Sequence, residues 1–304
     1  MSAPPRLDDA ALCRKFDVAA SAYANAAVVQ REVGNRLLER FDVMRIAPEV
    51  VLDMGCGPGT HTGALVARFP NAQVIAVDQS PKMLELAAPP KRGLLARFSR
   101  APRATALRAD MRAMPLKFGS ADVLWSNFSL QWASDLPTLF GEWNRVLRSD
   151  GVLMFTAPGP DTLKELRSAV ASVESSDVIR SHTFTDLHDL GDMLIHAGFA
   201  DPVMDMEVIT LEYADTKALW RDMRDQAATS SAAARPRGLM TPRKLNAIEA
   251  ALEHSRGSNG KIRISVEVVY GHAWKVPPKK TVEGHGIVRI DAIGRGGRSA
   301  PPTR

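Results

Sequence analysis

Three glycines in five positions, directly after an apolar segment, constrain this chain more than any other feature. The apolar run 50–52 predicts a short buried strand, and Gly55, Gly57 and Gly59 follow it. Glycine lets the backbone turn tightly and approach a ligand closely, because it has no Cβ. Residues 60–69 predict a helix, so the glycines lie at a strand-to-helix turn, where open α/β sheets bind nucleotide-like ligands.

An acid follows this turn at the spacing that a ribose-bearing ligand requires. Residues 74–77 predict a second strand that ends at Asp78, whose carboxylate can accept both hydroxyls of a ribose. The loop reads G-x-G-x-G rather than the dinucleotide pattern G-x-G-x-x-G, and it lacks the Lys and Ser of a P-loop. The interpretation of the chain as an NAD-linked oxidoreductase is therefore supported by Asp78 alone.

Strand and helix patterns alternate through the middle of the chain, which predicts an α/β fold with a parallel sheet covered on both faces. The C-terminal third has longer strands with helices between them, which we expect to cap the ligand crevice. The predicted units are N-terminal cap helices (1–47), the core (48–214), a helical cap insertion (215–260), the last core strand (261–275) and a basic, partly disordered tail (276–304).

The composition is that of a globular protein, with 45% hydrophobic and 24% charged residues. No apolar run approaches the length of a membrane span, and the N-terminus lacks an apolar signal core, so we expect a cytoplasmic protein with no membrane partner. Two cysteines, Cys13 and Cys56, agree with a reducing compartment. The histidines show no metal-ligand spacing, and we expect no metal.

The net charge of +5 is concentrated in segment 91–108 and in the tail beyond residue 275. Two interpretations stay open: solvated loops, or a landing surface for an acidic partner. Nucleic acid is not expected as a partner, because few aromatic residues lie among these charges and no binding motif is present.

The glycine loop, Asp78, and Asp110 after a third predicted strand together resemble the class I S-adenosylmethionine-dependent methyltransferases, over roughly residues 48–160. The resemblance implies a Rossmann-like, mostly parallel seven-stranded sheet with a helical cap, and S-adenosyl-L-methionine as cofactor. It implies the following cofactor-binding residues: Asp53, Gly55, Gly57 and Gly59 for the methionine moiety, Asp78 and Gln79 at the ribose, Asp110 and Met111 at the adenine, and Asn127 near the sulfonium.

A narrower resemblance comes from segments outside the loop. These are FDVAASAY at 16–23, QREVG at 30–34, WSNFSLQW at 125–132, FTAPGPDTLKELR at 155–167 and VEVVYGHAW at 266–274. Together they are similar to the malonyl-acyl-carrier-protein O-methyltransferases of biotin synthesis. That resemblance implies methyl transfer to the free carboxylate of a malonyl thioester, carried by acyl carrier protein or by coenzyme A. The chain departs from the family in its basic insert 89–102 and in segment 221–237.

The implied reaction needs no general base, because a carboxylate is already ionised at neutral pH. An arginine would select that carboxylate, since its planar fork binds carboxylates in two places. Arg145 and Arg167 are the candidates, and Tyr23 is the candidate for closing over the cofactor. Each also has an ordinary interpretation, as a solvated helix arginine or a helix-packing tyrosine.

Two alternatives share this fold. One is a methyltransferase of another small molecule, such as a quinone precursor. The other is a non-methylating protein like the assembly factors of respiratory complex I, which share the N-terminal motif. The segment Tyr270 to Trp274 favours the biotin family.

Overall fold

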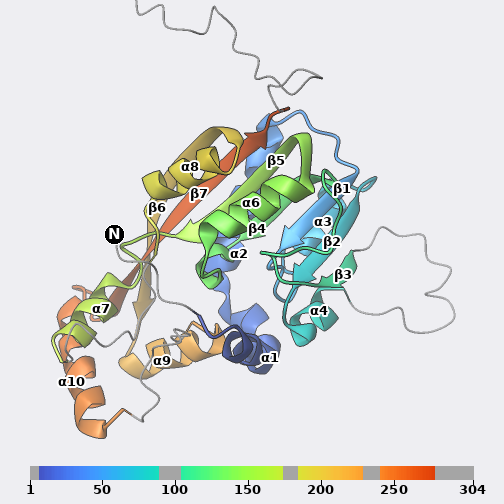
Figure 1. The fold of residues 1–304 in the computed structure, drawn as a ribbon. Helices are drawn as coiled ribbons and strands as arrows, with labels where there is room; N and C mark the ends of the chain where they lie inside the picture. Colours follow the sequence, from blue (N-terminus) through green and yellow to red (C-terminus); the bar gives the residue numbers. More distant parts are fainter. Residues whose placement is uncertain (1–6, 89–103, 174–183, 229–239, 278–304) are drawn as a thin grey trace, which may run out of the picture.

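The molecule is built on one seven-stranded sheet with the strand order β3-β2-β1-β4-β5-β7-β6 (Figure 1). The structure is a computed structural model, and it describes residues 7–88, 104–173, 184–228 and 240–277. The strands are β1 (Val50–Met54), β2 (Gln73–Asp78), β3 (Thr105–Arg108), β4 (Ala121–Asn127), β5 (Leu147–Pro158), β6 (Phe199–Tyr213) and β7 (Ile262–Lys275).

Strands β1 to β5 pair in parallel, and β7 runs antiparallel between β5 and β6. The predicted Rossmann-like, mostly parallel sheet is therefore confirmed. The chain leaves β1 toward β2 on one side and returns to β4 on the other. The carboxyl ends of β1, β2 and β4 thus flank the switch point, where such sheets bind ligands.

The helices of the described residues have the following bounds: α1 (Asp9–Ala26), α2 (Val28–Glu39), α3 (Thr62–Arg68), α4 (Pro81–Ala87), α6 (Leu136–Val146), α7 (Lys164–Ala171), α8 (Leu187–His196), α9 (Thr216–Asp225) and α10 (Pro242–Leu252). Short 3-10 turns occur at η1 (Arg40–Val43), η2 (Leu130–Trp132) and η3 (Glu253–Ser255). Polar side chains begin several helices: Asp8 accepts a hydrogen bond from Ala11 N at 3.0 Å, and Asp135 accepts one from Thr138 N at 3.0 Å.

The two faces of the sheet are covered by different helices. Leu52 and Leu124 point to the face covered by α6 and α8, whereas Val51 and Trp125 point to the opposite face, which α2 and α3 cover. Both faces are buried, so the central strands carry apolar side chains on both faces rather than in alternation.

Helix α2 differs from the prediction that residues 1–47 form a cap. Its apolar side chains Val29, Val33 and Leu37 pack with the strand residue Val51 in one core cluster. Only α1 of this segment lies over the carboxyl ends of the strands (Figure 1). The reason is the apolar stripe of α2, which matches a sheet face, while α1 is richer in alanine, whose small side chain buries less apolar area.

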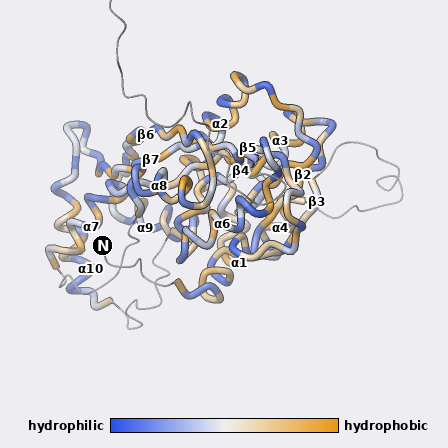
Figure 2. The backbone as a smooth tube through the Cα atoms, turned by 45° about the horizontal axis from the view of Figure 1, so that its top comes forward, coloured by the Kyte–Doolittle hydropathy of each residue, from blue (hydrophilic) through white to orange (hydrophobic). Residues whose placement is uncertain are grey.

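A separate apolar cluster holds the cap together. It joins Leu166 of α7, Leu219 of α9 and Ile248 of α10 with Ile262 and Ile264 at the start of β7. Helix α9 also packs against α1. In Figure 2 the hydropathy colour alternates along α1, α7 and α10, as expected for helices buried on one side only.

The basic insert 89–102, the loop part of segment 221–237 and the tail beyond residue 277 lie outside the described residues. Among the described helices, none is both long and apolar enough to cross a bilayer.

Candidate functional site

The glycine loop turns sharply at the end of β1. Gly55, Gly57 and Gly59 have φ angles of 68°, 54° and 82°, in the left-handed region that favours glycine. The loop is tied to the neighbouring strand, because Gly55 N donates to Val77 O at 2.8 Å.

The three glycines have different surroundings. A Cβ on Gly55 would lie 2.5 Å from Ser129 Cβ, and a Cβ on Gly59 would lie 2.5 Å from Ala87 Cα. A Cβ on Gly57 would meet only Tyr23 Cε1, at 3.9 Å. Gly59 therefore serves close packing against α4, and Gly57 is the glycine with open space before it.

That open space is a cavity of about 90 Å³ beside the carboxyl ends of β1, β2 and β4. The predicted residues that line it are Tyr23, Gly55, Gly57, Asp78, Gln79, Met111 and Asn127. Sequence reasoning missed several others: Leu12, Cys13, Phe16, Val77, Ser80, Phe128, Ser129 and Trp132. Phe16, Phe128, Ser129 and Trp132 belong to the segments that carry the family resemblance, which was the available signal for them.

Asp78 is held in place by the backbone. Its Oδ2 accepts a hydrogen bond from Gly57 N at 3.0 Å, and its Oδ1 accepts one from Ser80 N at 2.8 Å. Burial raises the pKa of Asp78, and these amide contacts oppose that rise. Each oxygen keeps a lone pair, so the carboxylate can still accept the two hydroxyls of a ribose.

Asp53 lies beneath the loop rather than on the cavity wall. It is 3% exposed, and its Oδ2 accepts a hydrogen bond of 2.5 Å from Thr62 Oγ1. Burial raises the pKa of Asp53 to about 7, against the lowering effect of the Thr62 contact. Direct contact with a ligand, as the resemblance implies for Asp53, requires a rearrangement of this pair.

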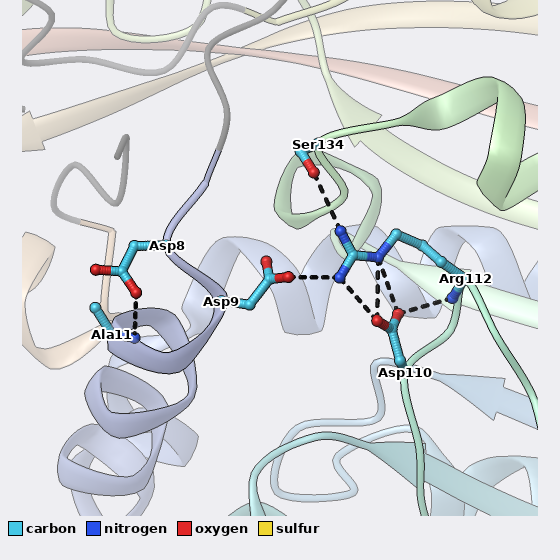
Figure 3. A network of polar contacts seen from close by, with 6 residues as sticks. All are labelled: Asp8, Asp9, Ala11, Asp110, Arg112 and Ser134. Atoms are coloured by element: carbon cyan, nitrogen blue, oxygen red, sulfur yellow. Dashed lines mark hydrogen bonds and ion pairs between the residues drawn. The ribbon is translucent and has the colours of Figure 1, made fainter. Parts of the chain in front are cut away.

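Asp110 does not line the cavity either, and its carboxylate is engaged by Arg112 (Figure 3). Arg112 Nη2 lies 2.7 Å from Asp110 Oδ2 and 2.6 Å from Asp9 Oδ2 of α1, and Arg112 Nη1 donates to Ser134 Oγ at 3.1 Å. The Arg112 guanidinium therefore ties the first turn of α1 to the segment after β3. Through this network Asp110 fixes the position of its neighbour Met111, which lines the smaller cavity.

Helix α1 is fixed over the cavity at further points. Ser80 Oγ donates to Asp17 Oδ1 at 2.5 Å. Phe16 contacts Tyr23 and Trp132 edge to face, with ring centroids 6.1 Å and 5.3 Å apart. These contacts close the cofactor side of the molecule with aromatic rings.

Asn127 joins three elements at the end of β4. Its Nδ2 donates to Gln30 O of α2 at 2.7 Å, and its Oδ1 accepts from Thr156 Oγ1 of β5 at 2.7 Å. The side chain is thereby oriented toward the cavity that it lines.

A second and larger cavity of about 560 Å³ lies between the sheet and the cap. Residues from α1, α2, α7, β6, α9 and α10 line it, most of them apolar. Tyr23, Phe128 and Trp132 line both cavities and so form a shared wall. The two cavities are therefore neighbours, with these three rings between them.

The two candidate arginines have different positions. Arg167 lines the larger cavity, where its Nη1 and Nη2 donate to the carbonyl oxygens of Thr162 and Pro160. Within the described ranges Arg167 forms no direct ion pair with a carboxylate, although the charge of Asp161 acts on it from further away. Arg167 is thus a cation in the lining of the larger cavity, the cavity that shares the three aromatic rings with the smaller one.

Arg145, the other candidate, lines neither of these two cavities. Its Nε lies 2.7 Å from Glu142 Oε2, and its Nη atoms donate to the carbonyl oxygens of Leu116 and Met114 at 2.8 and 3.0 Å. Arg145 holds segment 114–116 to α6, a contact that helical spacing alone did not indicate.

In the part of the chain that the structure describes, no group of three or more His, Cys, Asp or Glu residues could hold a metal ion. The groups that line the smaller cavity are chemically suited to a ligand with a ribose and a positively charged sulfonium. Gly57 leaves room where a Cβ would intrude, Asp78 presents a carboxylate, and aromatic rings close the other side.

A family model described as "Methyltransferase domain" matches residues 52–155. Two solved structures share the fold: the YcgJ protein from Bacillus subtilis (TM-score 0.54, 16% identity, 79% of this chain and 97% of that one) and a putative methyltransferase from Bacillus halodurans (TM-score 0.55, 16% identity, 80% and 98%). Fold and site thus define a methyltransferase of the class that uses S-adenosylmethionine.

Two relatives are similar over almost the whole chain. The malonyl-[acyl-carrier protein] O-methyltransferase of Laribacter hongkongensis is 44% identical, over 90% of this chain and 93% of its own length. The protein of the same name from Methylovorus sp. is 43% identical, over 88% and 90%. The chain belongs to the malonyl-[acyl-carrier protein] O-methyltransferase family.

Proposed function

We propose that the protein transfers a methyl group from S-adenosylmethionine to the free carboxylate of a malonyl thioester on acyl carrier protein, an early step of biotin synthesis. Malonyl-coenzyme A, which carries the same carboxylate, is the alternative acceptor. We propose the cytoplasm as the compartment in which the protein acts. The names of the relatives support the acceptor.

One observation carries the proposal: the two cavities share a wall of three aromatic rings, and an arginine lines the larger cavity. Tyr23, Phe128 and Trp132 separate the cofactor side from the larger cavity, which Arg167 lines. In this arrangement an anionic acceptor held by Arg167 would reach the methyl donor beside these rings, where the two cavities adjoin, so that oxygen, methyl and sulfur can align directly.

The bound cofactor supplies an electrophilic methyl group on a cationic sulfur. The protein's part is to bind, orient and exclude water. Because the acceptor is a carboxylate, ionised near neutral pH, no side chain has to remove a proton. Charge is neutralised as the anionic oxygen meets the cationic donor, so a water-poor site and good alignment provide most of the acceleration.

On the cofactor side we propose that Gly55, Gly57 and Asn127 surround the methionine moiety, while Asp78 and Gln79 bind the ribose. Met111 packs on the adenine. Three other predicted residues, Asp53, Gly59 and Asp110, do not line the smaller cavity and support it from outside. They position the loop, α4 and the segment after β3, respectively.

The experiment that tests the function is methyl transfer with purified protein. Labelled S-adenosylmethionine and malonyl-carrier should yield label in an alkali-labile ester, with acetyl-carrier as the matched acceptor that lacks the carboxylate. Equal transfer to both acceptors, or none to malonyl-carrier, contradicts the proposal. A bell-shaped pH dependence would indicate an acceptor that needs a base. Growth of a biotin-requiring strain that lacks this methyltransferase gives an independent readout.

The role of Arg167 is tested by Arg167→Gln, with Arg145→Gln as the matched control. Loss of a charge-assisted contact costs about 2 kcal/mol or more, so the KM for malonyl-carrier should rise about 30-fold or more with Arg167→Gln. Arg145→Gln should lower the melting temperature without changing this KM. A higher KM for Arg145→Gln than for Arg167→Gln would reverse the assignment.

A further inference from the structure

Arg224 of α9 lines the larger cavity and is exposed to solvent. Its guanidinium has no hydrogen bond or ion pair with any residue for which the structure gives a position. Lys217 and Arg221, at helical spacing from Arg224, are exposed too, so this face of α9 is cationic.

The acids of α9 and its N-cap do not compensate Arg224. Asp222 also lines the cavity, but its Oδ2 accepts a hydrogen bond from Tyr213 Oη at 2.6 Å. Asp215 caps the helix and accepts from Ala218 N at 2.7 Å. Asp225 is less exposed than Arg224 and forms no ion pair among the described residues.

The cavity is larger than an acyl group of a few atoms requires. Its volume of about 560 Å³ lies in the range of sites that enclose a ligand of drug size. Under the proposed function, the carboxylate end of the acceptor reaches the wall at Tyr23. The rest of the thioester must then extend through the cavity toward solvent. An exposed arginine in the lining is placed to meet the outer end of that chain.

We propose that Arg224 binds the phosphate at the outer end of a pantetheine arm, whether the arm belongs to a carrier protein or to coenzyme A. This inference rests on the proposed function. Arginine is suited to the role, because its fork donates two parallel hydrogen bonds to phosphate oxygens. The phosphate is the anion that every physiological pantetheine thioester carries. Arg224, unpaired among the described residues, is a cation in the lining of the cavity that would hold the arm.

The test compares two small acceptors that differ only in the phosphate: malonyl-phosphopantetheine and malonyl-pantetheine. The Arg224→Gln variant should raise the KM of the phosphorylated acceptor about tenfold, and it should change the KM of malonyl-pantetheine less than twofold. Arg224→Lys should give an intermediate KM. Lys217→Gln, on the same helix but outside the cavity lining, is the control and should leave both values unchanged.

Malonyl-carrier and malonyl-coenzyme A identify the source of the phosphate, and Arg224→Gln should raise the KM for both. A rise with malonyl-carrier alone overturns the proposal in favour of a contact with the carrier's own surface. An equal rise for the phosphorylated and unphosphorylated acceptors overturns it in favour of a packing role. An unchanged KM for all acceptors overturns it outright. If the wild-type protein methylates none of the four, the proposed function itself has failed.

Discussion

Asp53 and Thr62 form a buried pair beneath the glycine loop, with Thr62 Oγ1 donating to Asp53 Oδ2 at 2.5 Å. Burial raises the pKa of Asp53 to about 7, so below neutral pH the carboxyl group is protonated in the free protein. Protonation of Asp53 is therefore coupled to the binding of any charged ligand above the glycine loop.

The first prediction concerns the pH dependence of cofactor binding. A cationic ligand beside Asp53 favours the ionised carboxylate and lowers its pKa, so binding below pH 7 releases a proton. The affinity for S-adenosylmethionine should rise up to about tenfold per pH unit as the pH approaches 7, and level off above 7. Calorimetry in buffers of different ionisation enthalpy measures the released proton. In Asp53→Asn the release should vanish, and an unchanged release would contradict the assignment.

The second prediction separates two glycines that a sequence motif treats alike. Gly59→Ala places a methyl group against Ala87 Cα and should destabilise the fold by about 2 to 4 kcal/mol. Gly57→Ala meets no protein atom closer than 3.9 Å, so it should cost only the backbone penalty of about 1 to 2 kcal/mol. Its methyl group enters the smaller cavity, and S-adenosylmethionine should bind at least about tenfold more weakly.

Thermal unfolding and cofactor titration check this pair of variants. Gly59→Ala protein that is still folded should bind the cofactor nearly as well as the wild type. If Gly59→Ala weakened binding more than Gly57→Ala did, Gly59 would belong to the cofactor site after all.

The sheet, and the edge of the sheet where a ligand binds, could be predicted because short stretches of sequence determine them. Apolar runs that end at Asp53, Asp78 and Asn127 mark the strand ends, and parallel strands gather their carboxyl ends at one edge. The positive φ angles of the loop likewise follow from its glycines. Such features depend on residues that are adjacent in the chain.

What the sequence did not predict depends on packing between distant segments. Helical spacing gives no sign that Arg145 reaches the carbonyls of segment 114–116, or that Arg112 pairs with Asp9 of α1. Cys13 lines the cofactor cavity only because α1 lies across it. The prediction of cap helices for residues 1–47 also could not show that α2 covers the sheet while α1 caps its edge.

The third prediction treats α1 as a lid over the cofactor. A cavity of about 90 Å³ is smaller than ligand sites usually are, so we expect α1 to move outward when the cofactor enters and leaves. Asp17 holds the closed position through Ser80. The Asp17→Ala variant loses a hydrogen bond to a charged group, worth about 1.5 to 3 kcal/mol. Cofactor dissociation should therefore be at least about tenfold faster.

Stopped-flow displacement of bound cofactor measures this rate. Asp42→Ala is the control, since Asp42 forms an exposed ion pair with Arg68 and lines neither cavity. A dissociation rate for Asp17→Ala equal to that of the control would mean that α1 does not limit release.

The fourth prediction concerns the ring of Tyr23. Burial raises the pKa of the Tyr23 hydroxyl well above its ordinary value, with the charge of Asp78 adding to the effect. The hydroxyl therefore stays protonated at neutral pH and cannot act as a base. What Tyr23 provides is a ring in the wall between the two cavities, braced by Phe16.

Tyr23→Phe keeps that ring and should retain kcat within about threefold, whereas Tyr23→Ala opens the wall to water and should lower kcat about 100-fold. Both variants should keep the wild-type shape of the pH–rate profile between pH 7 and 9, because no tyrosine proton is transferred. If Tyr23→Phe lost as much activity as Tyr23→Ala, the hydroxyl would be the essential group, holding the acceptor by a hydrogen bond, and the wall would be secondary.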